Sequence, residues 1–150
     1  MLAAILALSL VVPAADAKEK ELSDVAKKEL KKLEGKWKAT KVVAEGKEIE
    51  PTMNGVDLVV EFKGRTFLFL GEELFEVAAL DPSTDPKLLD FKALKDMGEI
   101  TKGSTYEAIY KLDGNDLVLA LSTGTTNRPS KFESEKDSKT VVVTFKREKK

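Results

Sequence analysis

The chain has 150 residues, of which 34% are charged, and its 25 basic and 26 acidic side chains nearly cancel. This balance gives no electrostatic basis for binding nucleic acid or an anionic membrane surface. The sequence contains no His and no Cys, which excludes imidazole-based catalysis, disulfides and the usual zinc and iron–sulfur ligands. We therefore expect one domain stabilised by burial, without a metal and without a cofactor.

Residues 1–17, with the sequence MLAAILALSLVVPAADA, have the layout of a secretory signal peptide. The apolar run Leu2–Val12 lacks a preceding Lys or Arg, but Ala15 and Ala17 place small side chains at the −3 and −1 positions of a cleavage site. The run is shorter than the ~20 residues of a membrane span. We predict an exported protein, periplasmic or extracellular, without membrane insertion after cleavage; the alternatives are an uncleaved anchor and a buried helix.

Residues 18–34 predict a short N-terminal helix. Ser23 suits the N-cap and Gly35 lies where a helix would stop. Four lysines in the second half of the segment suit the negative end of the helix dipole. The sequence also predicts a narrow apolar stripe, too thin for a membrane-binding helix, so we expect this helix to pack against the domain. The stripe consists of Val25, Ala26, Glu29, Leu30 and Leu33.

From Trp37 onward the apolar residues alternate with a period of two, which is typical of half-buried β-strands. About eight short strands separated by turn signals predict an all-β, antiparallel, up-and-down β-barrel spanning residues 35–150, and closure into a barrel would remove exposed edges. No long helical pattern interrupts the run, so parallel βαβ units are not expected. The predicted strands are 37–43, 56–62, 65–70, 73–80, 87–94, 104–112, 116–122 and 140–146.

The motif Gly35-Lys36-Trp37 at the start of the first strand resembles the G-x-W of the lipocalin superfamily. That resemblance implies that Trp37 plugs the closed end of the barrel and that Arg147 packs over its ring. The ordered segments LEGKWKATKVVAEGKEI, LDPSTDPKLLDF, YEAIYKLDGNDLVLALS, RPSKF and VVVTFKRE are similar to a family of small, mostly exported bacterial domains described as lipocalin-like and of unknown function. The resemblance covers Leu33 to Lys150 and implies a fold and export, but no reaction.

Two acidic loops are candidate cation sites. Residues 113–116, Asp-Gly-Asn-Asp, lie between two alternating strands and lack the EF-hand spacing, so we interpret them as a hairpin turn. Residues 81–86, Asp-Pro-Ser-Thr-Asp-Pro, are richer in oxygen ligands, and Asp90 follows nearby. Asp-Pro sequences of this kind commonly form turns, and we favour that interpretation. Asp90 and Glu76 fall inside apolar strands, where burial would raise the pKa of a carboxyl group; alternation instead predicts that both point outward.

Arg128 is the only Arg between Arg65 and Arg147, and it precedes a proline in a polar loop. Its planar fork suits a carboxylate or phosphate. With Tyr106 and Tyr110, expected on the inner face of the barrel, Arg128 forms the best candidate ligand-binding site. The alternative, which we favour, is that Arg128 ties the loop to a strand end through backbone carbonyls or a local acid.

Nucleophile and nucleotide-binding motifs are absent from the sequence. We therefore expect a non-catalytic protein that binds a small, partly apolar molecule in the barrel. The second hypothesis is a ligand-free structural or protein-interaction module of the cell envelope, because an eight-stranded barrel can be filled by its own side chains. A carboxylate-dependent hydrolase is a weaker third hypothesis.

Overall fold

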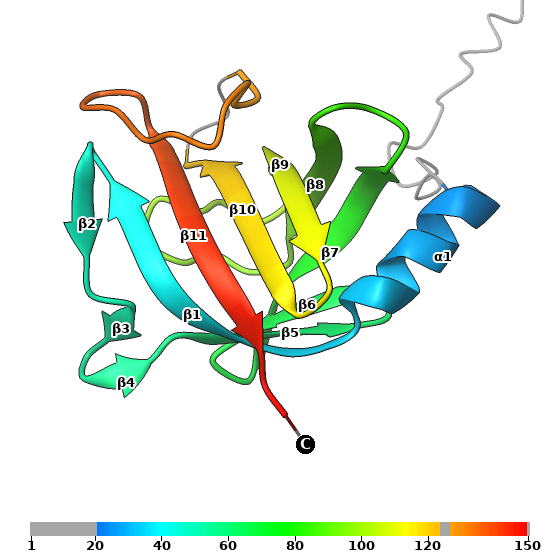
Figure 1. Ribbon diagram of the computed structural model, residues 1–150, viewed down its shortest axis with the longest axis horizontal. Helices are drawn as coiled ribbons and strands as arrows, with labels where there is room; N and C mark the ends of the chain where they lie inside the picture. The colour runs from blue at the N-terminus through cyan, green and yellow to red at the C-terminus, as the bar shows by residue number, and fades with distance from the viewer. Residues whose placement is uncertain (1–20, 124–126, 150) are drawn as a thin grey trace, which may run out of the picture.

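The computed structural model describes residues 21–123 and 127–149 (Figure 1). The predicted signal peptide, residues 1–17, lies outside the described residues. The described residues form one helix and eleven strands. These are α1 (Asp24–Leu33), β1 (Gly35–Ala44), β2 (Lys47–Ile49), β3 (Thr52–Met53), β4 (Val56–Asp57), β5 (Val59–Lys63), β6 (Thr66–Phe69), β7 (Glu72–Asp81), β8 (Lys87–Ala93), β9 (Thr105–Asp113), β10 (Asp116–Ser122) and β11 (Thr140–Arg147).

Eight of the strands close into an antiparallel barrel, which confirms the predicted lipocalin-like architecture. The order is β11-β10-β9-β8-β7-β6-β5-β1, and pairing between β11 and β1 completes the ring. The first half of β1 pairs with β5, whereas Val42 to Ala44 pair with the short strand β2. Strands β3 and β4 form a separate small hairpin beside β2. Neighbouring strands of the barrel follow one another along the chain, with β2 to β4 inserted between β1 and β5, as expected for an up-and-down meander.

The predicted turns and helix cap are present. Asp113 pairs with Asp116 across a two-residue turn in which Gly114 has a φ of 58°, so this stretch is a hairpin turn and not a calcium loop. The Ser23 hydroxyl accepts a hydrogen bond from the Ala26 amide at 3.1 Å, which caps α1. The helix is shorter than the predicted 18–34, and Val25 is exposed instead of lying on the buried stripe.

Aromatic rings fill the middle of the barrel. The centroids of neighbouring rings lie 5.0 to 6.5 Å apart, the separation at which aromatic side chains pack favourably. Strand alternation turns these rings inward together with aliphatic side chains from every wall of the barrel. The middle of the interior is therefore packed by the protein itself. The cluster comprises Phe62, Phe67, Phe75, Phe91 and Tyr106.

The two ends of the barrel differ. At the helix end, α1 packs its apolar side against the core, close to the short turns that join β5 to β6, β7 to β8 and β9 to β10 (Figure 1). At the opposite end, here called the loop end, the longer connections 94–104 and 123–139 leave the barrel. Core-packed apolar side chains at the loop end remain partly exposed. They are Leu58, Phe69, Ile100, Leu121, Val141 and Val143.

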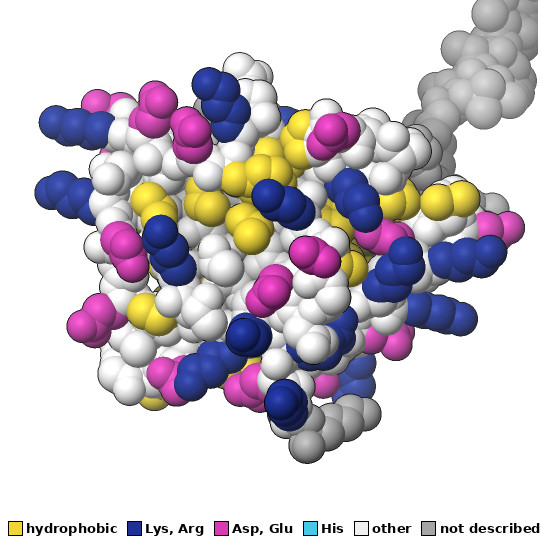
Figure 2. All heavy atoms as spheres, viewed as in Figure 1, with side chains coloured by type: hydrophobic (Ala, Val, Ile, Leu, Met, Phe, Trp, Pro, Cys, Tyr) yellow, Lys and Arg dark blue, Asp and Glu magenta, His cyan; other side chains and the backbone are white. Residues whose placement is uncertain are grey.

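A second, smaller apolar cluster lies outside the barrel. Ile109, Ala120 and Val142 point away from the interior yet are buried, and Phe132 from the β10–β11 connection packs against them. Figure 2 shows apolar side chains over β10 and β11 among charged side chains of both signs. The β10–β11 connection thus folds back over the outer wall and covers part of it.

Candidate functional site

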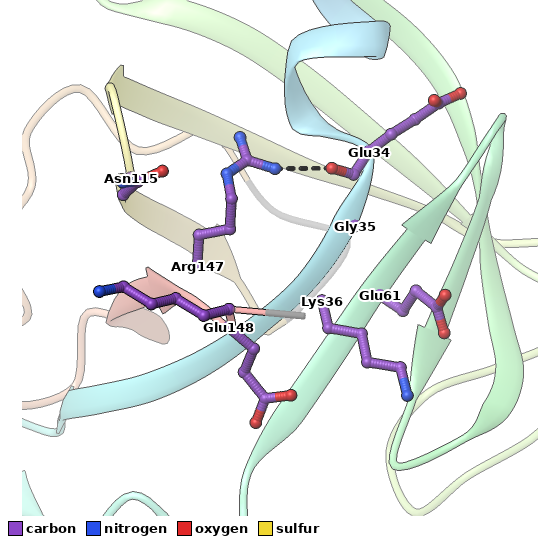
Figure 3. A pocket seen from close by; sticks show the side chains of 8 residues that line it. Glu34, Gly35, Lys36, Glu61, Asn115, Arg147 and Glu148 are labelled. Atoms are coloured by element: carbon purple, nitrogen blue, oxygen red, sulfur yellow. Dashed lines mark hydrogen bonds between the residues drawn. The ribbon is translucent and has the colours of Figure 1, made fainter.

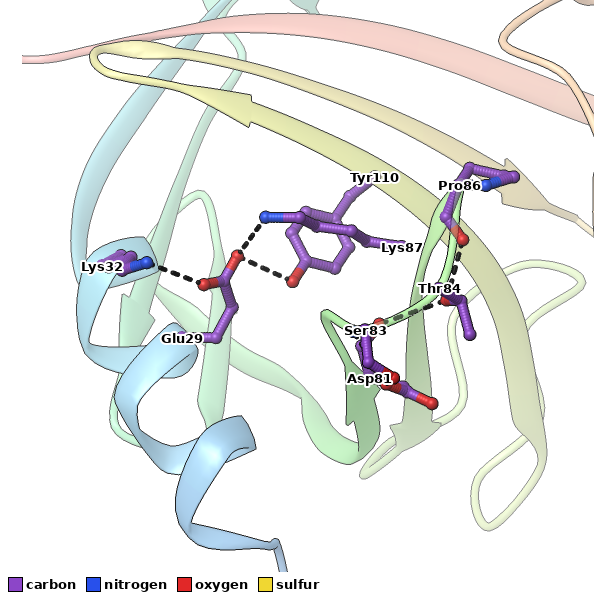
Figure 4. Close-up of polar contacts among 8 residues, drawn as sticks. All are labelled: Glu29, Lys32, Asp81, Ser83, Thr84, Pro86, Lys87 and Tyr110. Carbon is purple, nitrogen blue, oxygen red and sulfur yellow. Dashed lines mark hydrogen bonds and ion pairs between the residues drawn. The ribbon is translucent and has the colours of Figure 1, made fainter.

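The most buried charged group in the described residues is Glu29, on the barrel-facing side of α1. Its side chain is 4% exposed, and its two oxygens have three partners (Figure 4). Lys87 Nζ and Tyr110 Oη both donate hydrogen bonds to Oε1, at 2.9 and 3.0 Å. Lys32 Nζ lies 3.2 Å from Oε2. We call these four residues the Glu29 cluster; it joins α1 to β8 and β9.

Strand pairing places the two barrel donors side by side. Lys87 and Tyr110 are direct cross-strand partners of β8 and β9, so their side chains leave the sheet on the same face. The Lys87 ammonium also lies 5.8 Å from the centroid of the Tyr110 ring. Glu29 reaches both donors because it shares the buried face of α1 with Ala26, Leu30 and Leu33.

The charges in the Glu29 cluster fix the protonation of both acids. Burial alone would raise the pKa of Glu29, but hydrogen bonds from Lys87, Lys32 and Tyr110 and the charge of Lys87 bring that pKa below its ordinary value. Burial, followed by the charge of Glu29 and its hydrogen bond, raises the pKa of Tyr110 far above its ordinary value. Glu29 is therefore a carboxylate and Tyr110 a neutral donor at neutral pH.

This protonation pattern suits holding a carboxylate better than catalysis. Glu29 is occupied by three donors, so it has little capacity to accept a further proton from a substrate. Tyr110 gives up its proton less readily than a free tyrosine, which makes it a poor base or nucleophile. The geometry thus provides recognition of a negative charge, without an activated group.

The tryptophan and arginine singled out by the lipocalin resemblance meet at the helix end. Trp37 is fully buried, and the Arg147 guanidinium lies 4.2 Å from the centroid of its ring. Arg147 also donates to the carbonyls of Lys32 and Glu34, each at 2.7 Å. The Trp37 indole donates to the Leu33 carbonyl at 2.8 Å. Together these bonds satisfy carbonyls at the C-terminal end of α1 and hold it against the barrel.

A groove of about 730 Å³ runs outside the barrel beside this contact (Figure 3). Its walls come from the start of β1, the end of β11 and the β9–β10 turn, and they carry both Glu and Lys side chains. Gly35 has a φ of 117°, and an added Cβ would lie 3.3 Å from Arg147 Nη1, so this position requires glycine. The mixed charges of the groove select no particular ligand.

Arg128 lies on the outer face of the barrel. It donates to both oxygens of Asp90, at 2.6 and 3.2 Å, and to the Ala108 carbonyl at 2.8 Å. Asp90 lies between Leu89 and Phe91, whose side chains are in the core, so alternation turns Asp90 outward. The favoured interpretation, a tie to a local acid and a backbone carbonyl, describes these contacts.

Tyr106 and Tyr110 point into the barrel, so the β8–β9 wall separates them from Arg128. The expected single binding site made of Arg128 and a tyrosine is not formed, because the β10–β11 connection folds over the outer wall instead of across the mouth. The hydroxyl groups of the two tyrosines also make hydrogen bonds at different ends of the barrel. Tyr106 Oη accepts a hydrogen bond from the Thr101 amide at 2.9 Å in the β8–β9 connection, whereas Tyr110 belongs to the Glu29 cluster.

The remaining acidic candidates have structural partners. Asp81 accepts hydrogen bonds from the Ser83 amide and hydroxyl, at 2.9 and 2.6 Å, which lower the pKa of its carboxyl group and form the predicted turn. Glu76 lies 3.8 Å from Arg65 Nε, on the outer side of β7. Among residues 21–123 and 127–149, no three acidic side chains converge as a metal site would require. In the same part of the chain, no helix is long and apolar enough to cross a membrane.

Sequence reasoning missed the Glu29 cluster. Glu29 belongs to the predicted apolar stripe, and Lys87 is the first residue of a predicted strand. The available signal was an acidic residue on the buried face of the helix, three residues after Ala26 and four before Leu33, a position that calls for a buried partner. Its partners come from positions 58 and 81 residues farther along the chain, beyond the reach of local patterns.

Comparison of the chain with protein-family models, curated proteins and solved structures gives no match. The resemblance to exported lipocalin-like domains therefore stays a prediction from the sequence motifs.

Proposed function

We propose that this protein is a non-catalytic binding module that takes up a small, partly apolar molecule at the loop end of its barrel. The observation that supports this proposal is the partial exposure of inward-facing apolar side chains at that end. Binding sites for small molecules are commonly concave and lined by such side chains.

The packing of the rest of the barrel restricts where such a molecule would bind. Aromatic rings occupy the middle of the interior, and α1, Trp37 and Arg147 cover the helix end. A ligand would therefore enter only the last layer of the barrel, lined by residues such as Phe69, Leu121 and Val141. A shallow apolar site of this kind suits a ring or a short chain better than a long molecule.

We also propose that the protein is not an enzyme and that it is exported from the cytoplasm. The apolar side chains at the loop end carry no ionisable group, and Asp90 and Glu76, the acids that fall inside apolar strands, lie near Arg side chains on the outer wall. Residues 1–17 support export to the periplasm or the cell exterior.

The test is uptake of an apolar fluorophore by full-length protein and by two lysine variants. Val141→Lys places a charge at the loop end, and Thr144→Lys places the same charge on the outer face of the same strand. We expect saturable uptake by wild type, at least tenfold weaker uptake by Val141→Lys, and uptake within twofold of wild type by Thr144→Lys. Absence of saturable uptake by folded wild type, or equal weakening in both variants, would refute the proposal.

A specific observation also favours the second hypothesis, a module that binds another protein. Ile49, Met53 and Val56 are 49%, 41% and 58% exposed, and the last two are cross-strand partners in the β3–β4 hairpin. Exposed apolar groups gathered in this way are typical of contact surfaces. If wild type takes up no fluorophore but retains an envelope protein that Val56→Lys loses, this second function replaces the first.

A further inference from the structure

The Glu29 cluster has the composition of a ligand site that is already occupied. Two donors, Lys87 and Tyr110, converge on one carboxylate oxygen at 2.9 and 3.0 Å, and both belong to the barrel wall. The carboxylate itself comes from α1, a separate element that precedes the barrel in the chain (Figure 4). An ammonium and a phenol that meet on one oxygen form a strong, charge-assisted pair of hydrogen bonds.

The donors are positioned by the barrel and not by the helix. Lys87 and Tyr110 face each other as cross-strand partners, and the ammonium lies 5.8 Å from the centroid of the Tyr110 ring. The Tyr110 side chain is almost completely buried in the core. Removal of the Glu29 carboxylate would therefore leave the Tyr110 hydroxyl in place, with Lys87 beside it on the neighbouring strand.

From this geometry we infer that the helix end of the barrel is a carboxylate-binding site and that Glu29 occupies it as a built-in ligand. The site lies at the opposite end of the barrel from the loop end, so this inference stands independently of the proposed function.

The surroundings define the class of carboxylate. Ala26, Leu30 and Leu33 of α1 belong to the same core cluster as Tyr110, so the carboxylate lies beside apolar side chains. A groove of about 430 Å³ reaches Glu29 and Lys87 from outside, past Leu112 and Gly114. Lys32 and Arg147 also line this groove, giving it more positive than negative charge. The matching ligand is a small monocarboxylate with a short apolar chain.

Glu29 makes α1 an autoinhibitory element at this site. A carboxylate tethered to the same chain competes with a free one at a high effective concentration. Wild-type protein is therefore expected to bind a free monocarboxylate only weakly, and displacement of α1 or loss of the Glu29 carboxylate would open the site.

The experiment is chemical rescue of full-length Glu29→Ala by acetate and butyrate at constant ionic strength, followed by thermal unfolding. We expect the variant to melt below wild type in chloride, and its Tm to rise saturably with either carboxylate. The apparent affinity for butyrate should be at least tenfold higher in Glu29→Ala than in wild type. Butyramide, which has a similar shape but no charge, should give no saturable rise.

Three further variants link the rescue to this site. Glu29→Gln keeps the space filled with a neutral amide and should show no rescue. Adding Tyr110→Phe or Lys87→Met to Glu29→Ala should each weaken butyrate binding at least tenfold. Rescue that persists with Lys87→Met, or that butyramide reproduces, would overturn the inference. If Glu29→Ala is unfolded in chloride, circular dichroism with added butyrate decides: refolding supports the site, and failure to refold overturns it.

Discussion

At the scale of single residues, Arg128 joins three parts of the chain that are distant in sequence. Its guanidinium contacts Asp90 on β8 and the Ala108 carbonyl on β9, from a position 20 to 38 residues later. Both charged side chains are mostly shielded, with exposures of 24% and 17%. Because a forked guanidinium matches a carboxylate better than an ammonium does, a Lys in place of Arg128 would not reproduce these contacts.

We predict that Arg128→Lys lowers the free energy of unfolding by about 1–2 kcal/mol, because one ammonium cannot satisfy both Asp90 oxygens and the carbonyl. Urea unfolding of the single variants and of the double variant with Asp90→Asn measures the coupling. Lys146→Arg, on the exposed end of β11, is the control and should be neutral. Unchanged stability of Arg128→Lys with lost fluorophore uptake would instead assign Arg128 to ligand binding.

At the scale of elements, α1 is attached to the barrel mainly through its C-terminal half. Arg147 bonds two carbonyls there, the Trp37 indole bonds a third, and Glu29 reaches β8 and β9. These bonds add to the burial of the apolar side of α1 in the core. Local opening of α1 would break them without disturbing the strand pairing of the barrel.

We predict that Arg147→Lys makes the amides of α1 exchange with solvent about 5- to 30-fold faster, because loss of the forked contact and of ring stacking costs about 1–2 kcal/mol of local stability. Amides of β8, β9 and β10 should exchange as in wild type. Hydrogen exchange followed by NMR measures both sets in one sample. Equal acceleration in helix and barrel would show that α1 does not open separately.

Some of the observed strands could be predicted from the sequence, and others could not. The eight barrel strands were predictable because alternation, or in β6 a short continuous apolar run, between turn residues is a local signal. Strands β2 and β3 were not, because segments of two or three residues acquire strand geometry only through pairing with β1 or β4, and the predicted strand 56–62 divides into β4 and β5. Similarly, Tyr106 and Tyr110 were correctly expected inside, whereas the path of the loop that carries Arg128 depends on outer-wall packing.

At the scale of the whole molecule, the composition limits how stability can respond to pH. The chain has no His and no Cys, so no side chain with an ordinary pKa titrates between about pH 5.5 and 9. Stability should be nearly constant across this range and fall on both sides of it. The Glu29 cluster contributes to both falling limbs.

The acid limb comes partly from Glu29. Because its folded-state pKa is lowered, its stabilising effect is present above the unfolded value near pH 4–5 and is lost as the pH falls through the folded value. We predict that wild type is more stable than Glu29→Gln at pH 7 and that this difference shrinks toward pH 3. Urea unfolding at several pH values measures it, and a difference that grows with acidity would contradict the assigned sign.

The alkaline limb comes partly from Tyr110. Its folded-state pKa is raised, so its stabilising effect is complete below the unfolded value near pH 10 and is lost above it, where the unfolded chain ionises and the folded protein does not. We predict a constant stability advantage of wild type over Tyr110→Phe from pH 6 to 9. Above pH 10 the advantage should decline by about 1.4 kcal/mol for each pH unit. Taking the difference between the two proteins removes the shared titration of the lysines, so the decline reports Tyr110 alone. An advantage that stays constant to pH 11 would mean that the phenol ionises equally well in the folded protein, and that it does not lie against a buried carboxylate.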